Sequence, residues 1–290
     1  MHRSPRWAAC SGFATSCRSS VENAPDSVTI RVVRACVIAA FALAGGCGRI
    51  DFAAVGDGAP SQFVDGKVEA PQFVQQTATS SISAPATSVA FPGPITAGNT
   101  IVIHVSMWGS VTAVPPASSV TDTLGTTFAS AVGQVSTPGD CGSESVGGEI
   151  FYAHVSATAL DTITFTSGDT VSGLIAVEYG GLLVLDQVSM KLNGPMGPPM
   201  QTFDSGSTPA TTEAGEIAIS LGIPCAGAGG LVTWGANPGF TTRGVFDDAA
   251  EQPAMAADMP ATSIGTYTDT WTITFLANPS VALGLIATFH

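Results

Sequence analysis

The feature that most constrains the fold is a segment that recurs 110 residues further along the chain. Residues 162–179 align without a gap to residues 272–289, and both segments begin with Thr-Ile-Thr-Phe. Upstream, residues 97–103 (Ala-Gly-Asn-Thr-Ile-Val-Ile) resemble residues 214–219 (Ala-Gly-Glu-Ile-Ala-Ile). A pattern that returns in this way predicts two pseudo-symmetric halves built from the same supersecondary unit.

Short apolar runs that alternate with small polar residues dominate both halves. A period of two is typical of half-buried strands, and no segment has the apolar spacing of an amphipathic helix. Gly, Pro, Asp and Asn separate the runs often enough to predict antiparallel pairing in packed sheets. The expected strands are Ser88–Phe91, Thr100–Met107, Phe128–Val135, Glu149–Val155, Thr162–Phe165, Leu174–Tyr179, Glu216–Leu221, Tyr267–Phe275 and Val281–Phe289.

The strand Thr100–Met107 shows the alternation most clearly. Ile101, Ile103, Val105 and Met107 share one face, and the residues between them, including His104, share the other. This pattern predicts that His104 lies on a polar or partly exposed face. The same position is expected for His154, on the strand Glu149–Val155.

Two architectures satisfy the repeat. One is a single sandwich to which both halves contribute strands, and the other is two tandem immunoglobulin-like domains of about 110 residues each. We expect the first, an all-β, antiparallel, jelly-roll-like sandwich over residues 71–290, which is long enough to bury one sizeable core. In the second, the Gly- and Pro-rich stretch Asn193–Pro199 would be the linker.

The N-terminal part carries an export signal. Arg31 and Arg34 precede the apolar residues 35–44, and small residues then lead to Cys47, which is the order of a secretory signal. Ten helical residues span about 15 Å, half of what a bilayer requires. We therefore expect a cleaved signal and exclude residues 1–46 from the fold. Residues 1–27 are either a long n-region or, as we prefer, a stretch upstream of the true start.

Leu43-Ala-Gly-Gly-Cys47 resembles the bacterial lipobox, with its leucine one position further from the cysteine than usual. The resemblance implies cleavage before Cys47 and a lipid anchor of fatty chains, such as palmitate, on this residue. Gly48, rather than aspartate, implies the outer membrane. Ordinary cleavage near Ala44, with Cys47 as a free thiol, is the alternative. Residues 47–70, rich in Gly, Ala, Asp and Pro, are expected to be a flexible tether.

The exported part is strongly acidic. Beyond residue 46 the basic residues are Arg49, Lys67, Lys191 and Arg243, against twenty acidic residues, which gives a net charge of −16. Binding to nucleic acid or to anionic lipid headgroups depends on Lys and Arg that neutralise phosphates. The composition therefore excludes a nucleic-acid partner and predicts contact with the membrane through the Cys47 anchor.

Cys141 and Cys225 are the cysteines that remain after the signal region and Cys47 are set aside. Each lies in a turn-like sequence, Pro-Gly-Asp-Cys-Gly and Ile-Pro-Cys-Ala-Gly. Because exported proteins meet an oxidising environment, the pair predicts one disulfide that ties the two halves together. Two free thiols in separate domains are the alternative.

Motifs for catalysis are few. The sequence has no Gly-x-Ser-x-Gly elbow and no His-Glu-x-x-His helix, and it predicts no cofactor and no metal centre. Glu149 and Glu178 are the best candidates for a glycosidase pair, and His104 with His154 for a metal pair. The simpler interpretation of the glutamates is two solvated strand carboxylates, and that of the histidines is two residues on polar or partly exposed strand faces.

Sandwich proteins outside the cell often bind Ca²⁺ through Asp-rich loops. Asp247, Asp248 and Glu251 form an acidic cluster, and Asp122 lies in a Thr-Asp-Thr-Leu-Gly turn. The sequence contains no Asp-x-Asp-x-Asp-Gly loop. We therefore favour acids that keep the surface soluble over a calcium site.

Trp108 and Trp234 are the candidates for ligand binding. Each lies beside a glycine in a turn-like sequence, one in each half. An exposed indole face can stack on a sugar ring, whereas an indole at the end of a sandwich closes the core. Trp271, inside the last expected strand but one, is a candidate core residue between the sheets.

Several segments resemble a group of secreted or lipid-anchored bacterial β-sandwich modules with no assigned activity. They extend over most of residues 72–290 and are strand and turn motifs: Thr96–Ile103, Ser119–Phe128, Ile150–Ala153, Ala176–Gly181 and Gly284–Phe289. The resemblance implies a jelly-roll-like sandwich in a cell-surface setting.

These patterns together predict a lipid-anchored cell-envelope protein with a non-catalytic β-sandwich module. Its expected partner is a glycan or another surface molecule. The alternative is a cell-envelope hydrolase, of glycosidase or esterase type, with a shallow site.

Overall fold

The computed structural model describes residues 71–81, 86–166, 171–181, 183–196, 200–225, 232–235, 237–246, 253–275 and 281–290. The signal region, Cys47 and the tether lie outside the described residues, as do Asp247, Asp248 and Glu251. The described residues belong to one compact unit and form an all-β protein with antiparallel strand pairing. No helix among them is long and apolar enough to cross a membrane.

The first half contains strands β1 to β8. Five of them form a sheet with the order β1-β8-β3-β6-β5, and the other three form a sheet with the order β2-β7-β4. This is a jelly-roll-like layout, in which strands from the two ends of the half pair with each other. The bounds are β1 Phe73–Ser81, β2 Ala86–Ala90, β3 Thr100–Gly109, β4 Val120–Asp122, β5 Ala129–Val135, β6 Ser145–His154, β7 Thr162–Thr166 and β8 Val171–Tyr179.

The second half repeats this layout strand by strand. Its sheets have the orders β13-β14-β11-β16-β9 and β10-β15-β12, so each strand corresponds to the one eight places earlier. The registers agree as well, since Val120 pairs with Phe165 and Val232 pairs with Phe275. The bounds are β9 Leu185–Asn193, β10 Met200–Asp204, β11 Glu216–Pro224, β12 Val232–Trp234, β13 Thr241–Phe246, β14 Ala254–Ala261, β15 Thr270–Phe275 and β16 Ala282–Phe289.

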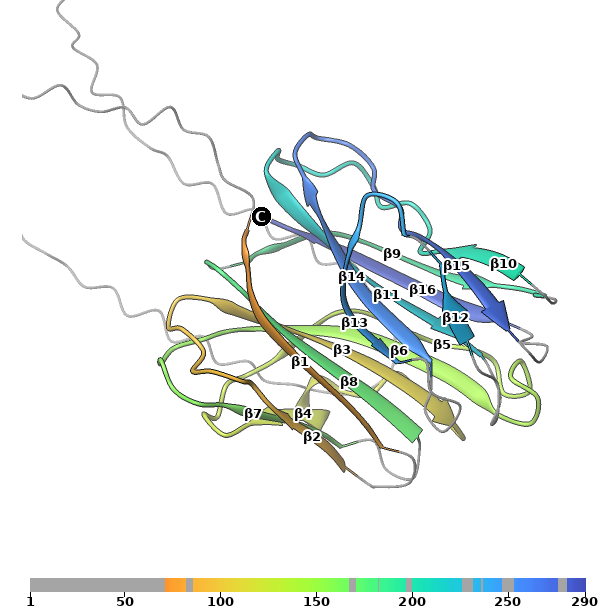
Figure 1. Cartoon of the computed structure of the whole chain (residues 1–290), viewed down its shortest axis with the longest axis horizontal. Coiled ribbons are helices and arrows are strands. Elements are labelled where there is room, and N and C mark those ends of the chain that lie inside the picture. Colours follow the sequence, from red (N-terminus) through yellow and green to blue (C-terminus); the bar gives the residue numbers. More distant parts are fainter. Residues whose placement is uncertain are drawn as a thin grey trace, which may run out of the picture. The chain divides into compact units, whose positions relative to one another are not determined.

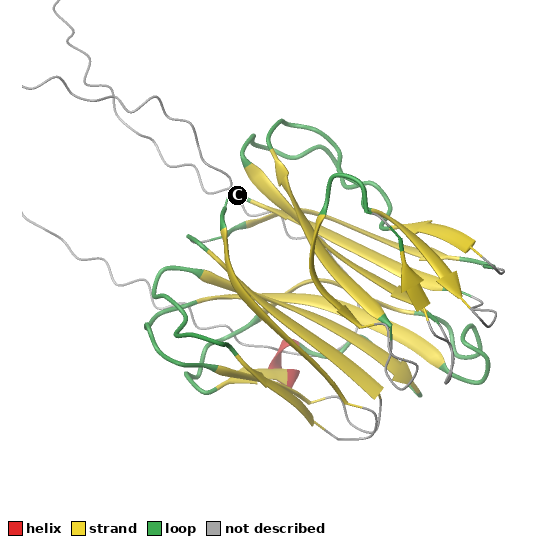
Figure 2. Ribbon diagram, viewed as in Figure 1, coloured by secondary structure: helices red, strands yellow, loops and turns green. Residues whose placement is uncertain are grey.

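The sheets lie in successive layers (Figure 1, Figure 2). Three hydrophobic clusters lie between these layers. The first cluster lies between the two sheets of the first half and includes Ile103 and Phe165. The second-half cluster, around Phe203 and Trp271, lies between the two sheets of that half. The central cluster contains residues of both five-stranded sheets, among them Ile150 and Leu221, so these sheets pack face to face.

This stack of four sheets differs from one sandwich with strands drawn from both halves. Each half keeps its own pair of sheets, because each repeat encodes a five-stranded and a three-stranded sheet of its own. One face of each five-stranded sheet is then left uncovered and apolar. The two such faces cover each other, which removes both from water.

All nine expected strands are confirmed, with ends that differ by a few residues, and seven more strands are present among the described residues. The expected placement of His104 is wrong, since its side chain is only 1% exposed. Successive side chains of β3 point alternately toward the central cluster and toward the first cluster. Both faces are buried, because a sheet in the middle of a stack is covered on both sides. His154, at the end of β6, is exposed as expected.

Candidate functional site

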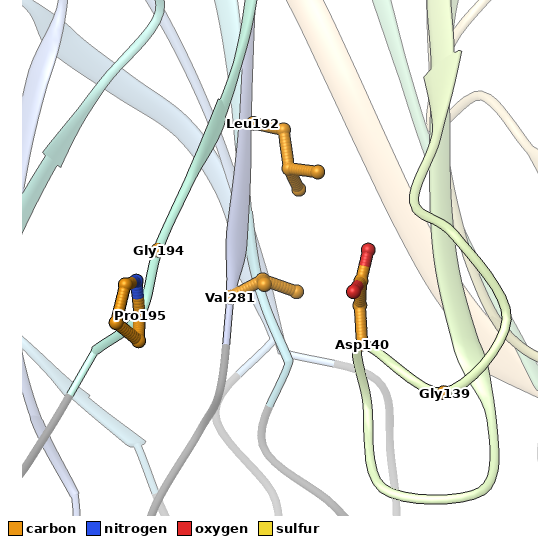
Figure 3. Close-up of a pocket in the computed structure, with 6 residues that line it drawn as sticks. All are labelled: Gly139, Asp140, Leu192, Gly194, Pro195 and Val281. Atoms are coloured by element: carbon orange, nitrogen blue, oxygen red, sulfur yellow. The ribbon is translucent and has the colours of Figure 1, made fainter.

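A groove with a volume of about 410 Å³ opens where the two halves meet (Figure 3). Gly139 and Asp140 line it from the loop between β5 and β6, and Leu192 and Val281 line it from the second half, together with Gly194 and Pro195. The side chains of Leu192 and Val281 point toward the loop that carries Asp140. We call it the disulfide groove, because Asp140 is next to Cys141 and the carbonyl of Val281 accepts a hydrogen bond from the backbone N–H of Cys225 at 2.9 Å.

The loop that carries Asp140 is tightly ordered by its own hydrogen bonds. Oδ2 of Asp140 accepts the backbone N–H of Thr137 at 2.8 Å, and Cys141 and Glu144 exchange two backbone hydrogen bonds. Gly139 and Gly142 have φ values of 96° and 71°, a region that glycine enters without the steric cost of a Cβ. The carboxylate is therefore held in place at the rim of the groove.

The disulfide between Cys141 and Cys225 is confirmed. It joins residues 84 positions apart, with 5.7 Å between the Cα atoms, which is an ordinary separation for a bridged pair. Both cysteines are buried. The bond connects the loop after β5 in the first half to the end of β11 in the second, so it fixes the two walls of the groove.

The composition of the disulfide groove limits its chemistry. Apolar side chains form one wall, and a single carboxylate stands opposite. Such a site can hold an apolar body that carries a cationic group or a hydrogen-bond donor. Among the described residues that line it there is no hydroxyl or thiol beside an imidazole, the arrangement that nucleophilic catalysis needs.

The expected turn positions of the two candidate tryptophans are wrong, since Trp108 lies in β3 and Trp234 ends β12. Neither is among the described residues that line the groove, and they contact different hydrophobic clusters. Trp108 is half-buried against the central cluster, and its indole N–H is buried without a partner. Trp234 is half-buried against the second-half cluster and donates its indole N–H to the carbonyl of Phe246 at 3.3 Å. Trp271 is 1% exposed, which confirms it as a core residue.

His104 and His154 are not brought together. His154 pairs with Thr100, four residues along β3 from His104, which places the two rings about 14 Å apart by strand geometry. Nδ1 of His154 lies 3.2 Å from the hydroxyl of Thr100. That hydroxyl is fully buried and donates to the carbonyl of Gly181 at 2.9 Å, so it is not an accessible nucleophile.

Glu149 and Glu178 are not brought together either, and the expectation that they are solvated is wrong, since both are buried. They pair with Val105 and Ile101, on opposite sides of β3, which separates them by about 16 Å. Carboxylates that cleave glycosides lie about 5 to 9.5 Å apart. Burial raises the pKa of Glu149 to about 7, against a hydrogen bond from Ser130 that lowers it.

Glu178 has a structural role that strand alternation did not indicate. It is fully buried, and its carboxylate accepts hydrogen bonds from the backbone N–H of Thr96, from Asn99 and from Gln75 at 2.6–2.7 Å. These contacts fix the loop between β2 and β3 against β8 and the edge strand β1. A buried carboxylate with this many internal hydrogen bonds holds the loop in place and does not act as an acid catalyst.

A polar network across the two halves was also missed by the sequence analysis. The carboxylate of Asp258 receives two hydrogen bonds from Arg243, at 2.6 and 2.9 Å, and one from the hydroxyl of Tyr179 at 2.7 Å. The guanidinium of Arg243 also lies 4.0 Å from the ring centre of Phe73. Burial, with the charge of Asp258, raises the pKa of Tyr179. The rarity of basic residues was the one sequence signal for this contact.

Within the described part of the chain, no three or more His, Cys, Asp or Glu side chains are arranged to hold a metal ion. No protein-family model, curated protein or solved structure matches the chain.

Proposed function

We propose that this chain is a lipid-anchored cell-envelope protein, attached to the outer membrane through Cys47, whose two packed sandwiches form a non-catalytic binding or structural module. The observation that carries the proposal is the buried disulfide between the halves. A structural disulfide persists in an oxidising compartment. Export is also what the order of Arg31, Arg34, the apolar segment and Cys47 predicts.

The ligand we propose is a glycan or a surface protein that enters the disulfide groove. The groove joins an apolar wall to one ordered carboxylate, which suits the mixed character of a sugar face or a peptide. Trp108 and Trp234 contact the hydrophobic clusters, which favours the groove over an aromatic platform. A glycan array probed with the wild type and with Asp140→Ala tests this. Glu144→Ala, in the same loop outside this groove, is the matched control.

Loss of array signals in Asp140→Ala but not in Glu144→Ala is the expected result. Equal signals in both variants would place the ligand elsewhere on the surface. Turnover in a parallel panel of glycosidase and esterase substrates would favour the alternative, a hydrolase with a shallow site.

The lipid anchor is tested by the variant Cys47→Ser in the native host. We expect this variant to lose incorporation of labelled palmitate and to leave the detergent phase. Cys36→Ser, which changes the other cysteine of the same apolar segment, is the matched control and should retain both. If Cys47→Ser still partitions and labels like the wild type, the anchor is not at Cys47.

A further inference from the structure

Two aspartates face inward at one end of the sheet β2-β7-β4. Asp122 ends β4 and pairs with Ile163, and Asp161 lies two residues before Ile163 in the chain. Residues two apart in an extended strand share a face, so both carboxylates lie on the side of the fully buried Ile163. Diagonal neighbours of this kind have Cα atoms about 7–8 Å apart, a separation that one ion between the carboxylates can bridge.

Each carboxylate is oriented by hydrogen bonds to one of its oxygens. Oδ1 of Asp122 accepts the backbone N–H groups of Leu124 and Thr126 at 3.2 and 2.7 Å. Oδ1 of Asp161 accepts the backbone N–H and the hydroxyl of Thr123 at 3.1 and 2.7 Å. The Oδ2 atoms of both residues are buried and have no hydrogen-bond partner among the described residues. Asp161 as a whole is 2% exposed.

Two unpaired carboxylate oxygens in such a place require a counter-charge or a proton, because an isolated buried charge is very costly. The basic side chains in the described part of the chain are engaged elsewhere, Lys191 with Asp204 and Arg243 with Asp258. Burial raises the pKa of Asp161, and the negative charge of Asp122 raises it further. The described residues therefore supply no basic side chain to these two carboxylates.

The second half shows what the same positions hold when they are apolar. Trp234 pairs with Ile273 as Asp122 pairs with Ile163, and Trp271 precedes Ile273 by two residues. Both indoles contact Phe203, with ring centres 6.3 and 5.0 Å from its own. The repeat thus directs these two side chains toward one buried point. In the first half that point is flanked by Phe91, whose N–H donates to the carbonyl of Asp161 at 3.1 Å.

We infer that the first half binds one hard divalent cation, Ca²⁺ in the first instance, between Asp122 and Asp161, where the second half packs two tryptophans. Hard cations take oxygen ligands, and calcium sites accept carboxylates together with backbone carbonyls and water. Two carboxylates from the protein suffice for such a site when backbone carbonyls and water fill the remaining coordination positions. The ion would close the end of the first cluster, as the indoles close the corresponding end in the second half.

The test uses the full chain after removal of metals with a chelator. Isothermal titration with CaCl₂, and separately with MgCl₂, is expected to give one binding site per chain. At a Ca²⁺ concentration 100 times the Kd, the equilibrium constant for unfolding should fall about 100-fold. Asp122→Asn and Asp161→Asn keep the Oδ1 acceptor, so the turn can form, and each should abolish both effects.

Asp186→Asn is the matched control, because the carboxylate of Asp186 also accepts hydrogen bonds from a loop. The donors are the backbone N–H and the hydroxyl of Thr212. It should bind Ca²⁺ like the wild type. If the wild type binds neither ion and Asp161→Asn is more stable at neutral pH, the two carboxylates share a proton and the inference is wrong. Calcium binding that persists in both Asn variants would also overturn the inference. Equilibrium dialysis of the folded variants is sufficient to measure this binding.

Discussion

His104 is an ionisable side chain enclosed by apolar neighbours. Its flanking residues across the sheet are Ile150 and Ile175, and it lies on the face of β3 that is turned toward the central cluster. Burial lowers its pKa to about 4, against a contact with the backbone of Ile175 that raises it. The folded protein therefore keeps the ring neutral at pH values where the unfolded chain protonates it.

The pH dependence of stability follows from this difference. Between pH 6.5 and 4 the unfolded chain gains a proton that the folded chain does not, so stability falls as the pH falls through this window, by up to about 3 kcal/mol. Below pH 4 both states are protonated and the loss stops. We expect His104→Leu to remove this part of the acid sensitivity, measured as the difference between urea unfolding at pH 7 and at pH 4. Ser106→Ala, at a buried position on the same face of β3, should keep it.

The outcome that contradicts this prediction is an equal change in unfolding free energy for the wild type and His104→Leu. The comparison concerns the pH dependence alone, so a constant offset in stability from the change in side-chain shape does not affect it.

At the scale of elements, alternation predicted the central strands better than the edges. The strands that were missed include β1, β9 and β13, which border the five-stranded sheets. Edge strands are covered on fewer sides, and β13 also has a register shift between Thr242 and Gly244. The strand β14 is almost wholly buried, so its sequence shows no alternation of apolar and polar residues. It also contains Pro260, and proline is uncommon inside strands.

A contact between the halves could be predicted from the sequence only where a single pair of residues was able to form it. Cys141 and Cys225 were the one pair of unassigned cysteines, so their bond could be predicted without a structure. Asp140, Leu192 and Val281 have no local signal, because the groove exists only where the two halves meet. Asp122 was noted as a turn residue, but its relation to Asp161 depends on the register between β4 and β7.

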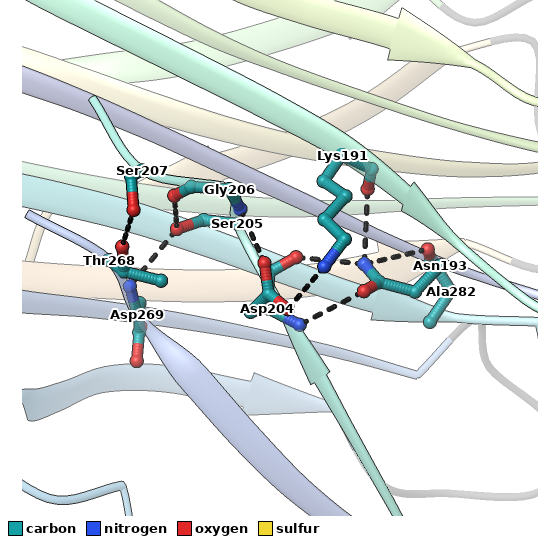
Figure 4. Close-up of polar contacts among 9 residues, drawn as sticks. All are labelled: Lys191, Asn193, Asp204, Ser205, Gly206, Ser207, Thr268, Asp269 and Ala282. Atoms are coloured by element: carbon teal, nitrogen blue, oxygen red, sulfur yellow. Dashed lines mark hydrogen bonds and ion pairs between the residues drawn. The ribbon is translucent and has the colours of Figure 1, made fainter. Parts of the chain in front are cut away.

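The crossing of β10 over β16 depends on the absence of a side chain at Gly284. A Cβ there would lie 2.3 Å from the carbonyl oxygen of Asp204 and 2.7 Å from the Cα of Ser205. The backbone carbonyl of Asp204 accepts a hydrogen bond from the side-chain amide of Asn193 at 2.8 Å, and its carboxylate accepts one from Lys191 at 2.6 Å (Figure 4). The neighbour is backbone and is tied in place, so it cannot move as a flexible side chain would.

Gly284→Ala is therefore expected to destabilise the protein by about 2–3 kcal/mol, the upper part of the range for overpacking in a filled core. Gly265→Ala is the control, because no atom lies within 4 Å of a Cβ built at that position. Its effect should stay within about 0.5 kcal/mol. Urea unfolding of both variants gives the measurement, and equal effects of the two substitutions would show that the crossing can relax.

At the scale of the whole molecule, three kinds of contact connect the halves. The central cluster contributes apolar burial from both five-stranded sheets. The disulfide contributes a covalent connection at the groove. The contact of Arg243 and Asp258 with Tyr179 and Phe73 contributes a polar connection beside strands β1 and β13. The repeat therefore produces two jelly-roll-like halves, but the central cluster belongs to neither of them alone.

This shared cluster predicts how the protein unfolds when the disulfide is removed. Closing a loop with a sequence separation of 84 residues stabilises by about 4–5 kcal/mol in the chain-entropy model, as an upper figure. The double variant Cys141→Ser/Cys225→Ser should therefore melt at a lower temperature. It should still melt in one transition, because opening the interface would expose the apolar faces of both inner sheets together. Calorimetry of this variant and of the oxidised wild type gives the comparison, and a reducing agent should leave the variant's melting temperature unchanged. Two separate transitions in the variant would mean that the halves are independent domains held together by the disulfide alone.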